Sequence, residues 1–251
     1  MKRLRPFVLV GFGVLVAAVC VRLGFWQLSR LAEKQALNAR LRAALAAPPR
    51  PLPPTGVPAD SLDAARFIVR GWFDQRNQIV LVNRVHGGEP GVEIVTPMKP
   101  EDGSEVLLVN RGWVPAADAA TANPADYPAP GLQTAVGLLS RIPQVVRPST
   151  TLWRPNPPPG PFPDSGQIHV RSTPRLDFDE VNNEFPYMVR GVILRELSTP
   201  GDAGLPARAE ARLYDETIHK SYAAQWFLFG TIALVGPFLL LRRRRSQSGY
   251  L

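Results

Sequence analysis

Cysteine and histidine are scarce in this chain, and their scarcity limits its chemistry. The 251 residues include 1 cysteine, Cys20, and 3 histidines, His86, His169 and His219. A single thiol excludes an intrachain disulfide, so the fold depends on its own core. Scattered histidines do not form the clustered ligand set of a protein metal site. Also absent are a phosphate-binding Gly-rich loop, a Gly-x-Ser-x-Gly elbow, a Cys-x-x-Cys pair and a His-Glu-x-x-His motif.

Carboxylates leave one catalytic alternative open. Asp177, Asp179, Glu180 and Glu184 lie close together in the sequence. Because two carboxylates are the catalytic groups of most glycosidases, a membrane-tethered hydrolase is one candidate. We favour the alternative that these residues form a solvated acidic turn.

Acidic residues are missing from both ends of the chain. All 21 of them lie within residues 29–220, together with 21 of the 29 basic residues, so this central segment is formally neutral. The net charge of +8 and the pI of about 10.2 therefore belong to the ends. A nucleic-acid-binding protein would carry its positive charge on the folded domain, so that class is excluded.

Two long apolar runs, residues 7–28 and 222–241, are predicted to cross a lipid bilayer. At about 1.5 Å per residue, runs of this length span a hydrocarbon core of about 30 Å. Lys2, Arg3 and Arg5 precede the first run, and four arginines, residues 242–245, follow the second. Basic residues at the ends of spans are retained in the cytoplasm, so both termini are expected there and the central domain outside. The lack of an Arg- and Ser-rich presequence favours a bacterial plasma membrane over a mitochondrial precursor.

The first run has two other interpretations. Val16, Ala17 and Ala18 would make a passable signal-peptidase site, although apolarity continues to Leu28. Cys20 could be a lipid attachment site, but the valine before it is larger than such sites prefer. We favour a membrane helix with Cys20 packed inside it.

Prolines and the periodicity of hydrophobic residues divide the chain into segments. We expect transmembrane helices at 7–28 and 213–241, the second with its juxtamembrane start. A polar helix and Pro-rich linker is expected at 29–58, an extracytoplasmic β-rich domain at 59–212 and a basic cytoplasmic tail at 242–251. Irregular loops are expected at 148–163 and 198–209. Short alternating segments predict an antiparallel sheet or small barrel. Its strands are expected at residues 67–73, 78–84, 91–98, 105–114, 134–141, 167–172 and 187–196. Leu-Val-Asn-Arg occurs twice, at 81–84 and 108–111, and could mark equivalent positions on neighbouring strands.

An unusual group of side chains lies at the predicted outer membrane boundary. His219, Tyr222 and Trp226 share one helical face, while Arg22 and Trp26 are expected at a comparable depth on the first span. Tyrosine and tryptophan are ordinary interfacial anchors. Arg22, inside the span, must reach the surface or find a partner. An imidazole, a cation and flat aromatics suit haem, with His219 on the iron and Arg22 beside a propionate.

Several segments together resemble the surfeit-locus-one family, the cytochrome c oxidase assembly factors. They are residues 23–30 (Leu-Gly-Phe-Trp-Gln-Leu-Ser-Arg) with Lys34, the triplet Val95-Thr96-Pro97, residues 109–115 (Val-Asn-Arg-Gly-Trp-Val-Pro), and His219-x-x-Tyr222-x-x-Gln225-Trp226-Phe227. They occur in the family's order and cover the chain nearly end to end.

The resemblance implies a non-enzymatic membrane factor that assists the insertion of haem a into subunit I of a haem-copper oxidase. Proteins of haem a synthesis would be further possible partners, besides the bilayer itself. The histidine implicated as a haem ligand in bacterial members corresponds to His219. A scaffold that stabilises oxidase subunits without binding haem is the competing hypothesis.

Overall fold

The computed structural model describes residues 4–57, 62, 64–144, 169–199 and 201–247. It divides into two compact units, a helical unit of residues 1–40 and 213–251 and a β-domain of residues 41–212. We call the first the helix pair. The elements are α1 (Leu4–Ala46), β1 (Arg50–Pro51), β2 (Arg66–Phe73), β3 (Asn77–His86), β4 (Glu89–Pro100), β5 (Val106–Pro115), η2 (Pro124–Asp126), β6 (Leu132–Arg141), β7 (His169–Thr173), α2 (Phe178–Glu184), β8 (Val189–Glu196) and α3 (Thr217–Gln247).

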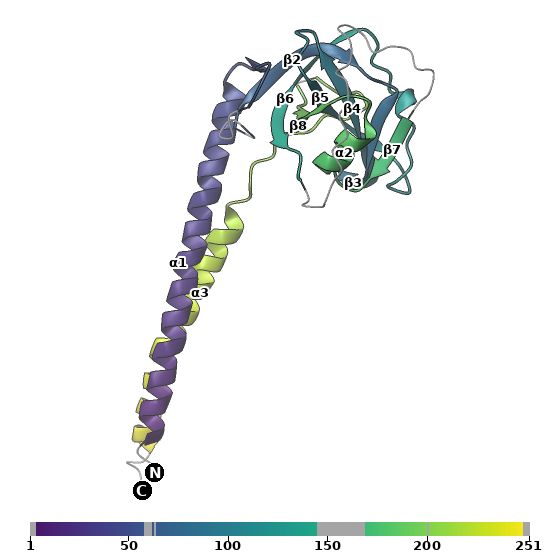
Figure 1. Ribbon diagram of the computed structural model, residues 1–251. Coiled ribbons are helices and arrows are strands. Elements are labelled where there is room, and N and C mark those ends of the chain that lie inside the picture. Colours follow the sequence, from purple (N-terminus) through teal and green to yellow (C-terminus); the bar gives the residue numbers. More distant parts are fainter. Residues whose placement is uncertain (1–3, 58–61, 63, 145–168, 200, 248–251) are drawn as a thin grey trace. The chain divides into compact units, whose positions relative to one another are not determined.

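In the helix pair, α1 and α3 run side by side (Figure 1), with small residues at their contact. A Cβ added to Gly13 would lie 2.6 Å from the carbonyl oxygen of Ala233, so the two backbones are in close approach. Cys20 is 5% exposed, and a Cβ added to Gly230 would lie 3.3 Å from its Cβ atom. Close approach of this kind allows dispersion contacts to hold helices together in lipid. Cys20 is thus packed inside the helix pair, as the sequence predicted.

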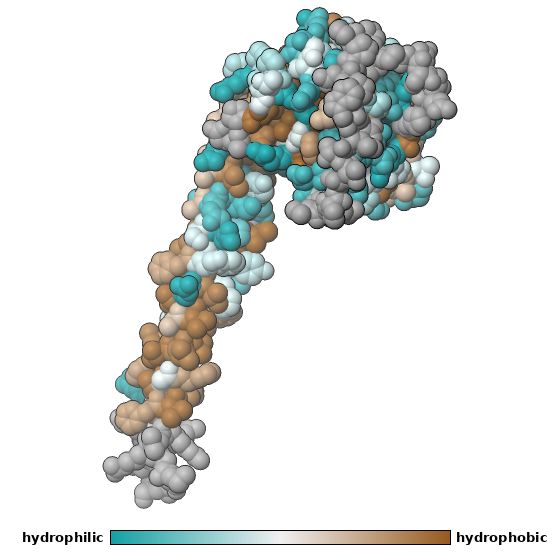
Figure 2. Space-filling model, viewed as in Figure 1, coloured by the Kyte–Doolittle hydropathy of each residue, from teal (hydrophilic) through white to brown (hydrophobic). Residues whose placement is uncertain are grey.

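The outer surface of the helix pair is apolar over much of its length, as the brown side chains show, and polar side chains cover another part of it (Figure 2). Large side chains such as Phe7, Phe12 and Phe238 are more than half exposed. Exposed apolar surface on this scale is unfavourable in water. Two segments, Phe7–Ala46 and Thr217–Leu240, are long and apolar enough to cross a membrane. The helix pair therefore has the character of a membrane anchor, and the predicted polar extension of the first span is helical through Ala46.

The β-domain is a closed barrel of five strands (Figure 1). The strands pair around the ring in the order β2, β6, β8, β5 and β4, and β4 pairs with β2 to close it. On β4 the sheet continues outward through β3 and β7, while β1 adds a short edge beside β2. The small barrel expected from the sequence is confirmed. Three pairs are nevertheless parallel, namely β1–β2, β3–β7 and β5–β8.

The barrel is held by the inward side chains of its strands. Leu107, Val109, Leu139 and Leu194 come from β5, β6 and β8 and are fully buried in one apolar cluster. Alternation of buried and exposed positions along β2 follows the two-residue repeat of a strand. Burial of a side chain of this size stabilises a fold by about 1.5–3 kcal/mol. This core, without any disulfide, positions the loops of the domain.

All seven predicted strands are present, with ends shifted by a few residues. Three elements were not expected: β1, which has only two residues, the short helix η2, and α2. The group of acidic residues at 177–184 is this helix and its cap, so the predicted solvated turn is wrong. Asp177 accepts hydrogen bonds from the backbone N–H groups of Asp179 and Glu180 at the start of α2. The predicted loop at 148–163 lies outside the described residues. The expected irregular stretch at 198–209 contains two isolated β-bridges, Trp113–Ala207 and Leu197–Ala209.

Candidate functional site

The predicted iron ligand, His219, lies in the first turn of α3 and faces α1. Its ring atom Nδ1 is 2.8 Å from Oε1 of Gln27, a residue 192 positions earlier in the chain. Both side chains are half-buried. Among the described residues, Nε2 of His219 has no hydrogen-bond partner. The imidazole is therefore held through one nitrogen and offers the other.

A second polar contact lies on α1 three turns beyond Gln27. Asn38 is only 1% exposed, and its amide donates to the backbone oxygen of Tyr214 at 3.0 Å and to Oε1 of Glu216 at 2.8 Å. Its Oδ1 accepts from the backbone N–H of Tyr214 at 2.8 Å. Beside it, Gln35 donates to Oε2 of Glu216 at 3.2 Å. These bonds fix the chain just before α3 against α1, three residues from His219; we call this group the Asn38 clamp.

Aromatic rings line the helix pair next to His219. Phe227 packs edge-on against Phe25, with 5.5 Å between ring centroids, and its ring fills the space above Gly24. Trp226 is half-buried, whereas Tyr222 is 48% exposed. His219, Tyr222 and Trp226 share one side of α3, as their spacing predicted. The exposed Tyr222 and the half-buried Trp226 therefore lie on the side of α3 that carries the imidazole.

The other two predicted site residues lie elsewhere on α1. Arg22 is two positions from both Cys20 and Gly24, which face α3, so at about 100° per residue it points to the opposite side of the helix. Arg22 and Trp26 line an open groove together with residues of α1 such as Ala18 and Ser29. Trp26 directly precedes Gln27 and carries Arg30 over its ring at 5.7 Å. Trp26 thus lies at the depth of His219, but it shares with Arg22 the side of α1 that lines this groove and points away from α3.

In the β-domain, the repeated tetrapeptide marks two β-bulges that flank β4. The register of β3 against β4 shifts between Leu81 and Arg84, and that of β5 against β4 shifts between Ile94 and Val95. From these sites Arg84 and Asn110 donate to the same atom, Oε2 of Glu93, at 3.3 and 3.0 Å. The two copies lie on strands that flank β4 and do not pair with each other. Their positions are not equivalent, since Leu81 lies opposite Glu93 and Leu108 opposite Pro97, so that suggestion from the sequence is wrong and their role is structural.

The Val-Asn-Arg-Gly-Trp-Val-Pro segment forms the second bulge and carries a buried charge. Arg111 is 6% exposed, donates to the backbone oxygen of Tyr127 at 2.8 Å and lies 5.3 Å from the centroid of Phe73. Burial lowers the pKa of Arg111, and the nearby Glu196 opposes this shift. Gly112 has φ of +127°, and an added Cβ would lie 2.4 Å from the backbone oxygen of Ala207, so glycine is required there.

A buried carboxylate accompanies Arg111. Glu196, at the end of β8, is 5% exposed, and its Oε2 lies 3.6 Å from Nε of Arg208. Burial raises the pKa of Glu196 above its usual range, against the opposing charges of Arg208 and Arg111. The ion pair of Glu196 and Arg208 therefore stabilises the fold less than the attraction of its charges alone would, because the cost of desolvating the buried charge opposes that attraction.

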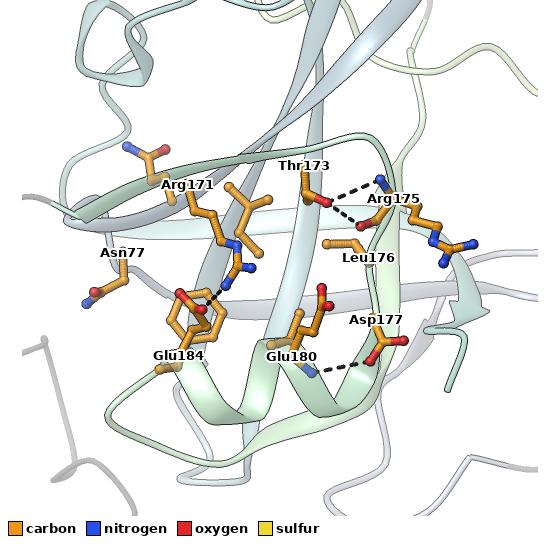
Figure 3. Close-up of a pocket in the computed structure, with 12 residues that line it drawn as sticks. Asn77, Arg171, Thr173, Arg175, Leu176, Asp177, Glu180 and Glu184 are labelled. Carbon is orange, nitrogen blue, oxygen red and sulfur yellow. Dashed lines mark hydrogen bonds and ion pairs between the residues drawn. The ribbon is translucent and has the colours of Figure 1, made fainter. Parts of the chain in front are cut away.

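The β-domain has a cavity between β3, β7 and α2, of about 50 Å³ (Figure 3). A volume of this size holds a few water molecules and excludes a tetrapyrrole. The carboxylates that raised the glycosidase alternative are engaged around it: Asp177 caps α2 and Glu184 pairs with Arg171. These contacts are those of a structural helix cap and an ion pair, which weakens the hydrolase alternative.

Sequence reasoning gave no role to Gln27 or Asn38. Gln27 stood within a quoted family segment, and a polar residue in an apolar run is a signal for a partner. Asn38 gave no such signal, because it lies in a polar stretch where an exposed amide is ordinary.

The fold and these contacts define a class: a β-barrel domain in a chain whose two end helices form an apolar, membrane-type pair. Comparison with known proteins narrows the class. A sequence model of the SURF1 family matches residues 14–231. The chain belongs to the SURF1 family.

Individual relatives agree with this assignment. The chain is 28% identical over 249 residues to a SURF1-like protein of Monosiga brevicollis, covering 93% of this chain and 88% of that protein. It is 37% identical over 108 residues to a SURF1-like protein of Rickettsia felis, covering 42% of this chain and 44% of that one. The cytochrome oxidase assembly protein SHY1 of Saccharomyces cerevisiae is 29% identical over 118 residues, 45% of this chain and 30% of that protein.

Proposed function

We propose that this protein is a non-enzymatic assembly factor for a haem-copper cytochrome c oxidase, and that it assists the delivery of haem a to subunit I. Two observations support the proposal. A relative bears the name of a cytochrome oxidase assembly protein. The one imidazole in the helix pair is held through Nδ1 at the junction of α1 and α3. The second observation carries the haem part of the proposal.

The residues present fit a haem group. His219 supplies a nitrogen ligand through Nε2, and Tyr222 and Trp226 supply flat contacts on the same side of α3. Bound haem would bring iron with an open coordination position. A carrier must also release its cargo, so one axial ligand on a half-exposed site suits transfer better than an enclosed pocket. Trp26 and Arg22 are further proposed contacts, although both line the groove on the side of α1 that points away from α3. Arg22 meets a propionate only if the haem extends around α1, and Arg22→Leu tests this contact.

We further propose that both termini are cytoplasmic and that the β-domain is exported from a bacterial plasma membrane, because basic residues end both spans. A phosphatase reporter inserted in the exposed turn at Gly103 should be active, whereas the same reporter fused after Leu251 should be inactive. Activity of the fusion after Leu251 would refute this orientation.

The alternative function is a scaffold that binds oxidase subunits and holds no haem. One observation favours the scaffold hypothesis. The family segment at residues 109–115 lies on strand β5 of the β-domain, outside the helix pair that carries His219. Proteins of haem a synthesis are further proposed partners under the first hypothesis and are not required by the second.

Substitution of the histidines separates the two hypotheses. His219→Ala should remove haem a from the full-length protein purified in detergent, because it removes the proposed axial nitrogen. His86→Ala and His169→Ala are matched controls in the β-domain and should retain it. Equal haem content in all three variants would refute the ligand assignment and favour the scaffold. Arg22→Leu should insert normally yet bind haem a more weakly; unchanged binding would assign Arg22 to the lipid surface.

A further inference from the structure

A hydrogen bond between Gln27 and His219 joins α1 to α3, and the role of the ring nitrogen in it depends on the tautomer of the imidazole. The atom of Gln27 that faces the ring is Oε1, at 2.8 Å from Nδ1. A carbonyl oxygen has no hydrogen to donate, so Nδ1 is the donor in this bond. In a neutral imidazole the other nitrogen, Nε2, then holds the free lone pair.

We infer that Gln27 is a positioning residue that fixes the Nδ1–H tautomer and the ring orientation of His219, and so presents Nε2 as a ligand nitrogen. The part of this inference that concerns iron rests on the proposed haem function. Histidines that bind metals almost always donate their second ring N–H to an acceptor, which sets both tautomer and orientation. Here the acceptor, Gln27, comes from α1 and the histidine from α3. The tautomer and orientation of His219 are therefore set only when the two helices are paired.

The position of Gln27 relative to the ring is fixed from both sides along the helices. One turn before Gln27, the ring of Phe227 fills the space that a Cβ on Gly24 would occupy, at 2.6 Å from the nearest ring atom. Beyond Gln27, the Asn38 clamp joins α1 to Glu216, which is three residues before His219. These contacts on both sides hold α1 and α3 together where Oε1 of Gln27 meets Nδ1 of His219. The orientation of His219 follows from this geometry.

A purely adhesive role for Gln27 makes a different prediction. Polar side chains that bond across membrane helices contribute to the association of those helices. Gln35 is a natural comparison, since it lies on the same helix and also bonds a residue at the start of α3, Glu216, at 3.2 Å. If both glutamines served adhesion alone, loss of either would leave the tautomer of His219 unchanged.

The tautomer can be read without haem. The full-length protein, labelled with ¹⁵N at histidine and purified haem-free in detergent, has only three imidazoles to resolve, and His219→Ala assigns the signal. Two-bond ¹H–¹⁵N correlations should show the Nδ1–H form for His219. Gln27→Glu should retain it, because a carboxylate also accepts. Gln27→Met should lose it, and Gln35→Met should keep it.

Titration with haem a then tests the link to iron. Gln27→Met should bind haem a about 10–100-fold more weakly, the loss typical for an outer-shell partner of a metal ligand. Gln27→Glu and Gln35→Met should bind like the parent protein. An Nε2–H form in the parent protein, or an unchanged tautomer in Gln27→Met, overturns the inference even if haem binds. A tautomer that depends on Gln27 in a protein that binds no haem a refutes the proposed haem function, while the control of the His219 tautomer by Gln27 stands.

Discussion

Replacement of Asn38 by alanine should loosen the start of α3 by a predictable amount. The change removes three hydrogen bonds, of 2.8–3.0 Å, to Tyr214 and Glu216. Each intramolecular hydrogen bond stabilises a fold by about 0.5–1.5 kcal/mol net. Because Tyr214 is 51% exposed, water replaces part of the loss, and we expect about 2–3 kcal/mol. This corresponds to about 30–150-fold faster amide exchange at local opening.

Hydrogen–deuterium exchange of the full-length protein in detergent measures this effect on peptides that cover residues 213–221. Gln35→Ala is the matched control, since it removes one exposed bond of 3.2 Å to the same Glu216 and should change exchange far less. Asn38→Asp places a carboxylate beside Oε1 of Glu216, and Glu216→Gln in that background should restore part of the protection. Equal exchange in Asn38→Ala and Gln35→Ala would refute the claim that Asn38 holds α3 in place.

Three further outcomes follow from other contacts. Gly230→Cys should form a disulfide with Cys20 on oxidation, because the two Cβ positions are 3.3 Å apart. Adding Gly13→Leu should lower the disulfide yield, because a side chain there would collide with the backbone of α3 at Ala233. Adding Gly11→Leu should leave the yield unchanged, because a Cβ at that position has no atom within 4 Å. Tyr187→Phe should destabilise the β-domain by about 1.5–3 kcal/mol in denaturant titrations, since it removes a buried hydrogen bond of 2.6 Å to Asp74; an unchanged midpoint would contradict this. The pKa of Glu196 is raised by burial, so its contribution to stability is full below pH 4.5 and is lost as the pH rises through the folded pKa. The melting temperature relative to Glu196→Gln should fall over that window, and a constant difference would refute the assignment.

The strands of the β-domain were predictable because one face of each is buried, which imposes a two-residue repeat. The repeat cannot say which strand pairs with which, so the parallel neighbours β5 and β8 were not foreseen. Two-residue β1 has no period to detect. The helix α2 is too short for a helical repeat, but Asp177 followed three residues later by Glu180 is a capping pattern that could have revealed it.

For the candidate site, the sequence placed His219, Tyr222 and Trp226 on one helical face, and they share that side of α3. It also placed Trp26 at the depth of His219. It could not tell that Arg22 faces away from α3, because helical spacing gives angles within a helix and not the side on which a partner packs. The contact between Gln27 and His219 depends on that packing, which is why it was visible only in the structure.

The ring order of the barrel has a consequence for biosynthesis. Strands β5 and β6 are consecutive in the chain but do not pair, because β8 lies between them. While the chain emerges, both strands therefore present open edges until residue 196 has been made. The strand that closes the ring is followed after a short segment by α3, so completion of the barrel and arrival of the second membrane helix are nearly simultaneous. A premature stop before residue 189 would remove both together and leave a sheet with two open edges, a substrate for aggregation and for quality-control proteases.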